Sequence, residues 1–300
     1  MMNMLQELLS QKVLIFDGAM GTRLQKKGLP AGYPPEEWNL SHPDTVREIH
    51  QSYVDAGADL IQTNTFGANR LRLGKYGLTE KIRDINHRAV SIAHSTLKPG
   101  VILLASVGPL GEFLEPFGDL THQKARDIFQ EQVDILREAG IEFFHLETFN
   151  SSQEAILALE AVHETGGKAI VSFTFNRRGN QFTTLLGETP ETLVSTFSSL
   201  PVLSLGANCG TGMKEMVSIM ADYRKYHPHL FLSAKPNAGV PQLVGETVFY
   251  TETPEDFAKG AIELLALNVQ IIGGCCGTDE RYIKALKDAT MTKRTQEKIQ

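Results

Sequence analysis

The chain has 300 residues, of which 42% are hydrophobic and 21% are charged, and its formal net charge at pH 7 is −6. These values are ordinary for a globular protein, and the acidic balance argues against a nucleic-acid surface, which needs clustered Lys and Arg. No apolar run approaches the roughly 20 residues that span a bilayer, and Met1 to Lys12 lacks the pattern of an export signal. We therefore expect a cytoplasmic protein with reduced cysteines that binds neither nucleic acid nor membrane.

Short apolar segments alternate with helix-like segments along the whole chain. The apolar segments, which we predict to be strands, are residues 13–17, 59–67, 101–109, 141–148, 168–175, 203–210, 230–239 and 269–278. Helices are predicted between them and after the last, at residues 41–56, 79–96, 121–139, 152–165, 190–199 and 211–226, from 254 and from 278 to about 289. Thr253 and Thr278 are the expected N-caps of the last two helices.

Eight strand-then-helix units in succession predict a closed parallel (β/α)8 barrel, the TIM barrel. We expect a single α/β domain at residues 1–290, followed by a polar tail or linker remnant at 291–300. An open doubly wound sheet is the alternative, but the first strand lacks the G-x-G-x-x-G turn that would favour it. Active sites of barrels lie at the C-terminal ends of the strands. At those ends the sequence places Asp17, Asn64, Ser106, Glu147, Cys209, Asn237, Cys275 and Cys276.

The three cysteines of the chain all lie where a predicted strand ends. Cys209 follows the sixth strand, and the adjacent pair Cys275 and Cys276 follows the eighth. Three thiolates would make an all-sulfur donor set for zinc that leaves one position open. Adjacent cysteines do not fit the C-x2-C spacing of a closed structural zinc site. Two other interpretations stay open at this point, namely buried cysteines acting as small apolar residues and a redox pair at Cys275 and Cys276.

Six motifs at the strand ends together resemble one known family. They are Asp17-Gly18-Ala19-Met20-Gly21-Thr22, Gln62-Thr63-Asn64-Thr65-Phe66, Glu147-Thr148-Phe149, Ala207-Asn208-Cys209, Pro236-Asn237-Ala238-Gly239 and Gly273-Gly274-Cys275-Cys276-Gly277. This set resembles the homocysteine-binding domain of the homocysteine S-methyltransferase family. It is most similar to the N-terminal module of cobalamin-dependent methionine synthase and of bifunctional homocysteine methyltransferase/methylenetetrahydrofolate reductase proteins. The resemblance covers about residues 5 to 290.

The resemblance implies a role for each site residue. Zinc would be held by Cys209, Cys275 and Cys276, with the homocysteine sulfur as fourth ligand. The substrate ammonium would lie between Asp17 and Glu147, and its carboxylate would meet backbone amides around Gly18, Ala19 and Ser106. Asn237 matches a position that can offer its side-chain oxygen to zinc when no substrate is bound. Structural roles remain alternatives: Asp17 as a turn former before glycine, and Glu147 in an ion pair with a neighbouring Arg or Lys.

The implied activity is zinc-dependent transfer of a methyl group to the thiol of L-homocysteine, which forms methionine. Zinc would lower the pKa of the substrate thiol and so generate a thiolate nucleophile. The methyl donor could be methylcobalamin on a separate corrinoid protein, S-methylmethionine or a betaine. The alternative is a homocysteine-binding module that is inactive without a separate corrinoid or folate methyl-donor protein. A weaker alternative is a barrel aldolase or lyase with Lys235 as a Schiff-base lysine.

Overall fold

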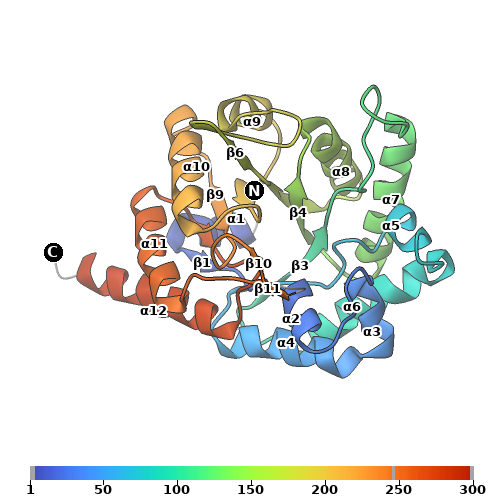
Figure 1. Cartoon of the computed structure of the whole chain (residues 1–300), viewed down its shortest axis with the longest axis horizontal. Coiled ribbons are helices and arrows are strands. Elements are labelled where there is room, and N and C mark those ends of the chain that lie inside the picture. Colours follow the sequence, from blue (N-terminus) through green and yellow to red (C-terminus); the bar gives the residue numbers. More distant parts are fainter. Residues whose placement is uncertain (1–3, 245–246, 298–300) are drawn as a thin grey trace.

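A computed structural model describes residues 4–244 and 247–297. Eight parallel strands form one sheet in the order β1-β12-β9-β8-β5-β4-β3-β2, and a bridge between Phe16 and Leu60 joins its two edges. The predicted closed (β/α)8 barrel is thereby confirmed (Figure 1). Each predicted strand segment overlaps one of its strands, and only β4 extends past its predicted end, by one residue to Phe149. The strands are β1 (Leu14–Ile15), β2 (Leu60–Gln62), β3 (Ile102–Val107), β4 (Phe143–Phe149), β5 (Lys168–Phe173), β8 (Ser204–Asn208), β9 (Leu232–Lys235) and β12 (Ile271–Ile272).

One long helix follows each barrel strand, and these helices form the outer ring in Figure 1. They are α4 (Pro43–Asp55), α6 (Ile82–His94), α7 (His122–Glu138), α8 (Ser152–Glu164), α9 (Pro190–Phe197), α10 (Met213–Tyr226), α11 (Pro254–Ala266) and α12 (Glu280–Glu297). The predicted cap of α11 is confirmed, because the Thr253 hydroxyl accepts a hydrogen bond from the Asp256 N–H at 3.2 Å. Among the described residues, none of these helices combines the length and the apolar character that crossing a bilayer requires.

The predicted cap of α12 is wrong. This helix begins at Glu280, and the Thr278 hydroxyl instead donates to the Cys275 carbonyl at 2.7 Å and accepts from the Ala19 N–H at 3.2 Å. Thr278 therefore joins the loop after β12 to the loop after β1, a pairing that no local pattern could indicate. The helix also continues to Glu297, past residue 290, and the division into barrel and tail stays a prediction.

Several shorter elements were not anticipated from the sequence. They are the helices α1 (Met4–Gln11), α2 (Gly21–Lys26), α3 (Trp38–Ser41) and α5 (Arg70–Gly74), the 3-10 turn η1 (Pro35–Glu37), and the antiparallel hairpins β6 (Asn176–Arg178) with β7 (Gln181–Thr183) and β10 (Gln242–Val244) with β11 (Thr247–Phe249). The helix predicted from residue 79 begins with a 3-10 turn, η2 (Thr79–Lys81), that leads into α6. Most of these shorter elements lie within connections from a strand to its helix, whereas α1 precedes the barrel. Figure 1 shows the β10–β11 hairpin near the middle of the ring of helices.

Three apolar clusters make up the core of the described chain, and two of them involve the barrel strands. The larger one lies between the strands and the outer helices and contains Ile61, Ala105 and Leu146, among others. The smaller one fills the barrel interior, where Leu5 and Leu9 of α1 pack against Leu14, Phe16, Leu60, Ile102, Leu104, Phe143, Ile170, Leu203 and Ile271. We call this smaller group the interior cluster. Because α1 supplies two of its members, the helix acts as a plug in the N-terminal end of the barrel.

Side chains alternate along each strand, and this alternation carries the interior from apolar to polar. Ser106 lies two residues beyond Leu104 in β3, and Gln62 lies two residues beyond Leu60 at the end of β2. Both polar side chains are buried, like the apolar ones that precede them. The C-terminal end of the interior is therefore a polar layer, in the place where barrels carry their active sites.

Candidate active site and metal centre

The polar layer opens into a cavity of about 490 Å³ at the C-terminal ends of the strands. This volume lies within the range of roughly 300–1,000 Å³ that is usual for small-molecule sites. Most of the residues predicted from the sequence line the cavity, namely Asp17, Gly18, Ala19, Ser106, Glu147, Cys209, Cys275 and Cys276. Asn64 lines it as well, whereas the buried Asn237 does not.

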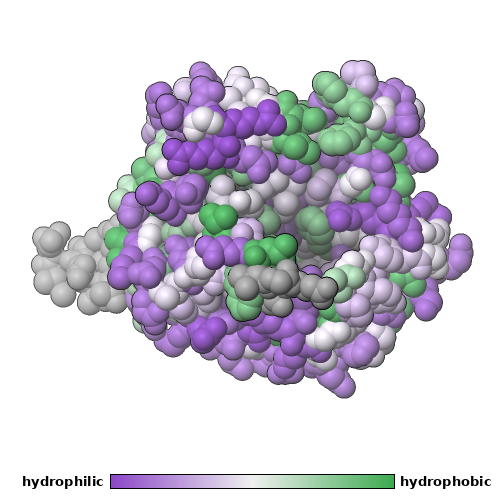
Figure 2. Space-filling view, viewed as in Figure 1, coloured by the Kyte–Doolittle hydropathy of each residue, from purple (hydrophilic) through white to green (hydrophobic). Residues whose placement is uncertain are grey.

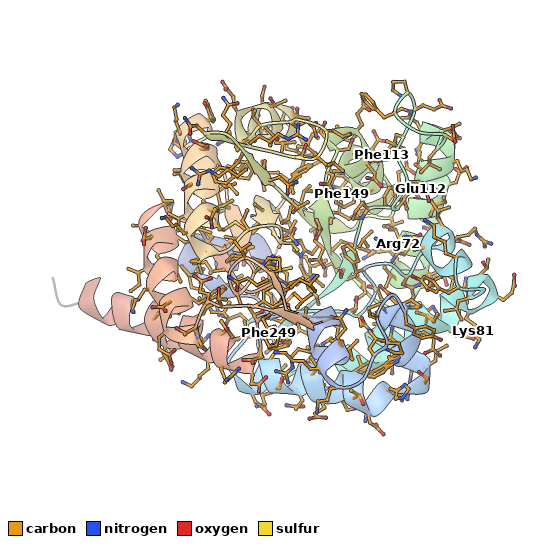
Figure 3. The ribbon with its side chains drawn as sticks, viewed as in Figure 1. Arg72, Lys81, Glu112, Phe113, Phe149 and Phe249 are labelled. Atoms are coloured by element: carbon orange, nitrogen blue, oxygen red, sulfur yellow. The ribbon has the colours of Figure 1, made fainter. Side chains whose placement is uncertain are left out.

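Loops of the same face surround the mouth of the cavity. Figure 2 shows this face hollowed near its middle, with apolar side chains standing among polar ones around it. Phe113 and Phe249, labelled in Figure 3, come from the connections after β3 and β9 and are 48% and 51% exposed, but neither lines the cavity. Tyr33 and Tyr76 do line it and are 40% and 47% exposed, so the cavity includes partly exposed aromatic rings.

The three cysteine sulfurs converge at the cavity wall. The Sγ atoms of Cys209 and Cys276 are 3.8 Å apart, and the three Sγ atoms all lie within 4.8 Å of one another. The end of β9 holds both cysteine segments in register, because the Cys209 N–H donates to the Lys235 carbonyl and the Cys275 N–H donates to the Pro236 carbonyl. All three thiols are free and partly accessible. The sequence-based expectation that two strand ends bring them together agrees with this geometry.

Glycines allow these segments to approach closely. A Cβ on Gly273 would lie 2.5 Å from the Cβ of Phe16, and one on Gly274 would lie 2.4 Å from the Thr278 hydroxyl. Cys209 itself has a positive φ of 58°, and the next residue, Gly210, has a φ of 71°. A non-glycine residue in this region is strained, which is a feature of sites where the backbone must aim a side chain.

The sulfur geometry fits a tetrahedral metal ion. Zinc–sulfur bonds of about 2.3 Å at tetrahedral angles separate neighbouring sulfurs by about 3.8 Å, which is the distance between Cys209 and Cys276. A hydrogen bond with Cys275 works to lower the pKa of Cys209, but its contact with Cys276 and its burial outweigh this and raise that pKa to about 12. Three thiolates at such spacing would repel one another unless a cation lay between them. The donor set therefore suits a soft divalent cation.

Glu147 lies beside this sulfur cluster, because Asn208 Nδ2 contacts both its Oε2 and the Cys275 sulfur. Its Oε1 accepts hydrogen bonds from Gln62 Nε2 at 2.8 Å and from the Ser106 hydroxyl, and its Oε2 accepts from Asn208 Nδ2 at 3.3 Å. No Lys or Arg pairs with it in the described part of the chain, so the alternative of an ion pair with such a residue is not realised. His145 lies 3.9 Å from Oε2, but burial, aided by the Lys235 charge, lowers the pKa of His145 well below 6.5 and keeps it neutral.

Asp17 is held differently from Glu147, because a lysine pairs with it. Its Oδ1 is 3.0 Å from Lys235 Nζ and its Oδ2 accepts from the Gln62 N–H at 2.7 Å, while both side chains of the ion pair are only 5% exposed. Burial raises the pKa of Asp17, and the Lys235 charge opposes that rise. The Asp17 carboxylate thus has two buried donors, which is more than a turn former requires.

The predicted backbone donors differ in their availability. The Ala19 N–H donates to the Thr278 hydroxyl and the Ser106 N–H donates to the Thr63 hydroxyl, both at 3.2 Å. Within the described residues, the Gly18 N–H has no protein acceptor. A side chain at Gly18 would lie 2.8 Å from the ring of Tyr53, so only glycine fits there.

Asn237 lies behind the cavity wall. Its Oδ1 is buried and has no hydrogen-bond partner among the described residues. Its backbone N–H donates to the Thr211 carbonyl, and the next residue, Ala238, donates to the Cys276 carbonyl. An unpaired buried amide oxygen beside a cysteine segment is unfavourable unless another group pairs with it.

Sequence reasoning missed Gln62 and Asn208 as site residues and named Lys235 only as a possible Schiff-base lysine. The Asn208 amide pairs twice with Thr148, through Oδ1 to the N–H at 2.8 Å and through Nδ2 to the hydroxyl at 2.7 Å. The same Nδ2 lies 3.9 Å from the Cys275 sulfur. A period-two count from Leu60 marks Gln62 as an inward polar residue, but nothing local to the chain shows what it contacts.

Comparisons with known proteins agree with this geometry. Residues 14–290 match the family model described as homocysteine S-methyltransferase. The chain belongs to the homocysteine S-methyltransferase family. It is 32% identical over 303 residues to the methionine synthase of Mycobacterium leprae and 30% identical to that of Mycobacterium tuberculosis. Each alignment covers 95% of this chain but only 25% of the relative, so the chain spans about a quarter of their length.

A solved structure has the same fold over nearly its whole length. The homocysteine methyltransferase MmuM from Escherichia coli, in its metallated form, superposes with a TM-score of 0.79 at 23% identity. The superposition covers 95% of this chain and 99% of the MmuM chain. Family membership and this shared fold thus agree with the TIM-barrel architecture of the chain and with a cavity at the C-terminal ends of its strands.

Proposed function

We propose that this protein transfers a methyl group to the thiol of L-homocysteine and so forms methionine, in a zinc-dependent reaction of methionine biosynthesis. Membership of the homocysteine S-methyltransferase family supports the activity. The observation that carries the proposal is the convergence of three cysteine sulfurs, all within 4.8 Å of one another, on the wall of the cavity.

Cys209, Cys275 and Cys276 are the residues that would hold zinc. When bound, zinc would lower the pKa of the substrate thiol, so that homocysteine loses its proton at neutral pH. The unpaired Oδ1 of Asn237 supports a role as an oxygen donor toward the metal when no substrate is present. A reducing cytoplasmic compartment is part of this proposal, because the three thiols have to remain reduced.

The chain's own residues would bind and orient the amino-acid part of homocysteine. Asp17 and Glu147 form the acidic side of the cavity, which suits the ammonium group. The free Gly18 N–H suits the carboxylate, and the predicted amides of Ala19 and Ser106 lie on the same wall. These groups would keep the sulfur of the substrate facing the cysteine cluster while the methyl donor approaches through the open mouth.

The methyl donor is the open part of the proposal. The candidate donors are methylcobalamin supplied by a separate corrinoid protein and a small molecule such as S-methylmethionine or a betaine. The matches to methionine synthases and to MmuM support methyl transfer and do not distinguish between these donors. The corresponding second candidate is a homocysteine-binding module that needs a partner protein for turnover.

Zinc analysis and a donor screen test the function together. The purified chain is expected to retain about one zinc per molecule, as a site with three thiolate ligands would. It is then mixed with homocysteine and, in separate reactions, with methylcobalamin, S-methylmethionine or betaine, and methionine is quantified. Turnover with any donor supports the enzyme, whereas zinc-dependent binding of homocysteine without turnover supports the module. A chain that binds neither zinc nor homocysteine would refute both. A lyase would instead keep its activity in the presence of a chelator and lose it on replacement of Lys235.

A further inference from the structure

Lys235 is the one buried Lys or Arg among the residues that the structure describes. It ends β9 and lines the cavity, yet its ammonium group is already surrounded by protein groups. Nζ donates to Asp17 Oδ1 at 3.0 Å and to Gln62 Oε1, and it lies 4.0 Å from the centroid of the Phe16 ring. An ammonium group has three N–H donors, of which these hydrogen bonds use two, and the cation–π contact with Phe16 adds a third favourable interaction. The Lys235 charge is therefore already stabilised by groups of the protein.

This arrangement makes Asp17 and Glu147, two of the three carboxylates that line the cavity, unequal partners. Asp17 forms an ion pair with Lys235, whereas Glu147, within the described residues, accepts hydrogen bonds only from uncharged donors. Gln62 connects the two groups. Its Oε1 accepts from Lys235 and its Nε2 donates to Glu147 Oε1 at 2.8 Å, so the lysine decides which way the amide points.

We propose that Lys235 is a positioning residue of the proposed reaction, an internal counter-ion that neutralises Asp17 and orients Glu147 through Gln62. Glu147 alone then contacts the substrate ammonium, and Asp17 acts through Lys235. This inference rests on the proposed function and refines it. The subsite for the ammonium group then offers one carboxylate, Glu147, that has no cationic side chain as partner in the described part of the chain.

A double-mutant cycle separates this arrangement from one in which Asp17 touches the ammonium directly. The four zinc-loaded proteins are the parent chain, Asp17→Asn, Lys235→Met and the double variant, and the dissociation constant for homocysteine is measured by calorimetry. Asp17→Asn leaves the buried Lys235 ammonium without an anionic partner beside the substrate ammonium. This variant is expected to bind homocysteine roughly 100-fold more weakly than the parent. The double variant removes both charges and is expected to recover to within about 10-fold of the parent. If Asp17 contacts the substrate itself, the double variant binds as weakly as Asp17→Asn, and the inference is overturned.

Steady-state kinetics distinguish positioning from a general loss of structure. In Lys235→Met, the KM for homocysteine is expected to rise about 10-fold or more while kcat stays within about threefold of the parent value, because the lysine does not touch the reacting sulfur. Lys168→Met is a matched control at the start of β5, where the lysine pairs with Glu142 on the surface at 2.7 Å, and it should leave KM unchanged. An equal fall of kcat and kcat/KM in Lys235→Met would contradict a positioning role.

Thermal unfolding keeps the test independent of substrate. If Lys235 is the counter-ion of Asp17, the double variant is expected to unfold at a higher temperature than Asp17→Asn, and the reverse order would overturn the pairing. Failure of the proposed function is visible separately, because the parent chain itself would then not bind homocysteine. Failure of the present inference shows instead in the order of the variants and in the kinetics of Lys235→Met.

Discussion

The two ends of the barrel are built on the same strands but hold their side chains together in different ways. At the N-terminal end, the interior cluster is apolar and plugged by α1. At the C-terminal end, inward positions only two residues further along carry polar groups, such as Ser106 after Leu104. Each apolar residue contributes mainly through its own buried surface, whereas each polar group depends on a specific partner. Apolar packing at the N-terminal end, the packed end, can therefore hold the strands in position. The C-terminal end, the open end, can then carry buried polar groups that would destabilise the fold without their hydrogen-bond partners.

Removing a sulfur from the open end should have the largest effect. In Cys276→Ala, two thiols cannot replace the three-sulfur donor set, so the zinc content is expected to fall from about one per chain to nearly none. Metal analysis and homocysteine calorimetry on the same sample measure both losses, and circular dichroism checks that the barrel persists. Zinc remaining near one per chain would show that Cys276 is not a ligand.

Leu104→Ala tests the packed end. The side chain is completely buried, and its truncation is expected to lower the free energy of unfolding by about 3 kcal/mol. Chemical denaturation measures the change, and zinc content should stay as in the parent. The paired variant Ser106→Ala, two residues further along β3, should do the opposite, with little loss of stability but weaker homocysteine binding. Equal effects of the two variants would show that the two ends are not separable.

Glu147→Gln sharpens the comparison within the open end. The amide keeps the shape of the side chain but removes the charge proposed to hold the ammonium, so binding of homocysteine should weaken by about 2 kcal/mol, or roughly 30-fold. Zinc content should not change, and its loss would mean that Glu147 belongs to the metal centre instead. Glu142→Gln, on an exposed glutamate just before β4, is the matched control and should leave binding unaffected.

His50 of α4 is buried like the residues of the packed end and polar like those of the open end. In the described part of the chain, it lacks the hydrogen-bond partners that stabilise polar groups at the open end. Both ring nitrogens lack partners within the described residues, and burial lowers the pKa of His50 from 6.5 to about 4. The unfolded chain takes up this proton below pH 6.5 while the folded chain resists until about pH 4. The contribution of His50 to stability is therefore intact above pH 6.5 and is lost progressively below it, by about 2 kcal/mol at pH 5.

Denaturation at pH 7 and pH 5 checks this expectation. His50→Leu should remove about 2 kcal/mol of the acid sensitivity, because leucine has no proton to take up. The same measurement on a variant of the exposed His94 in α6 provides the control. An unchanged pH dependence in His50→Leu would exclude His50 as its source.

Local pattern was sufficient for the architecture and for the sulfur cluster. Apolar runs separated by helix-like segments predict eight strand-helix units, and the cysteines follow two of these strands, Cys209 directly after β8 and Cys275 and Cys276 shortly after β12. Because all strands of a parallel barrel end on one face, cysteines far apart in sequence had to meet there. The hairpins β6–β7 and β10–β11 were not predicted, because strands of only three residues are too short to show an alternation of apolar and polar residues.

The amino-acid sequence by itself determined the barrel, the face that carries chemistry and the three sulfurs, since each follows from periodicity and from the direction of parallel strands. The tertiary structure alone decided how the charges are distributed. The partners Asp17 and Lys235 are 218 positions apart, and Gln62 and Glu147 are 85 apart. Residue types at such separations do not reveal which donor meets which acceptor. That choice depends on strand register and on side-chain burial, which exist only once the barrel has closed.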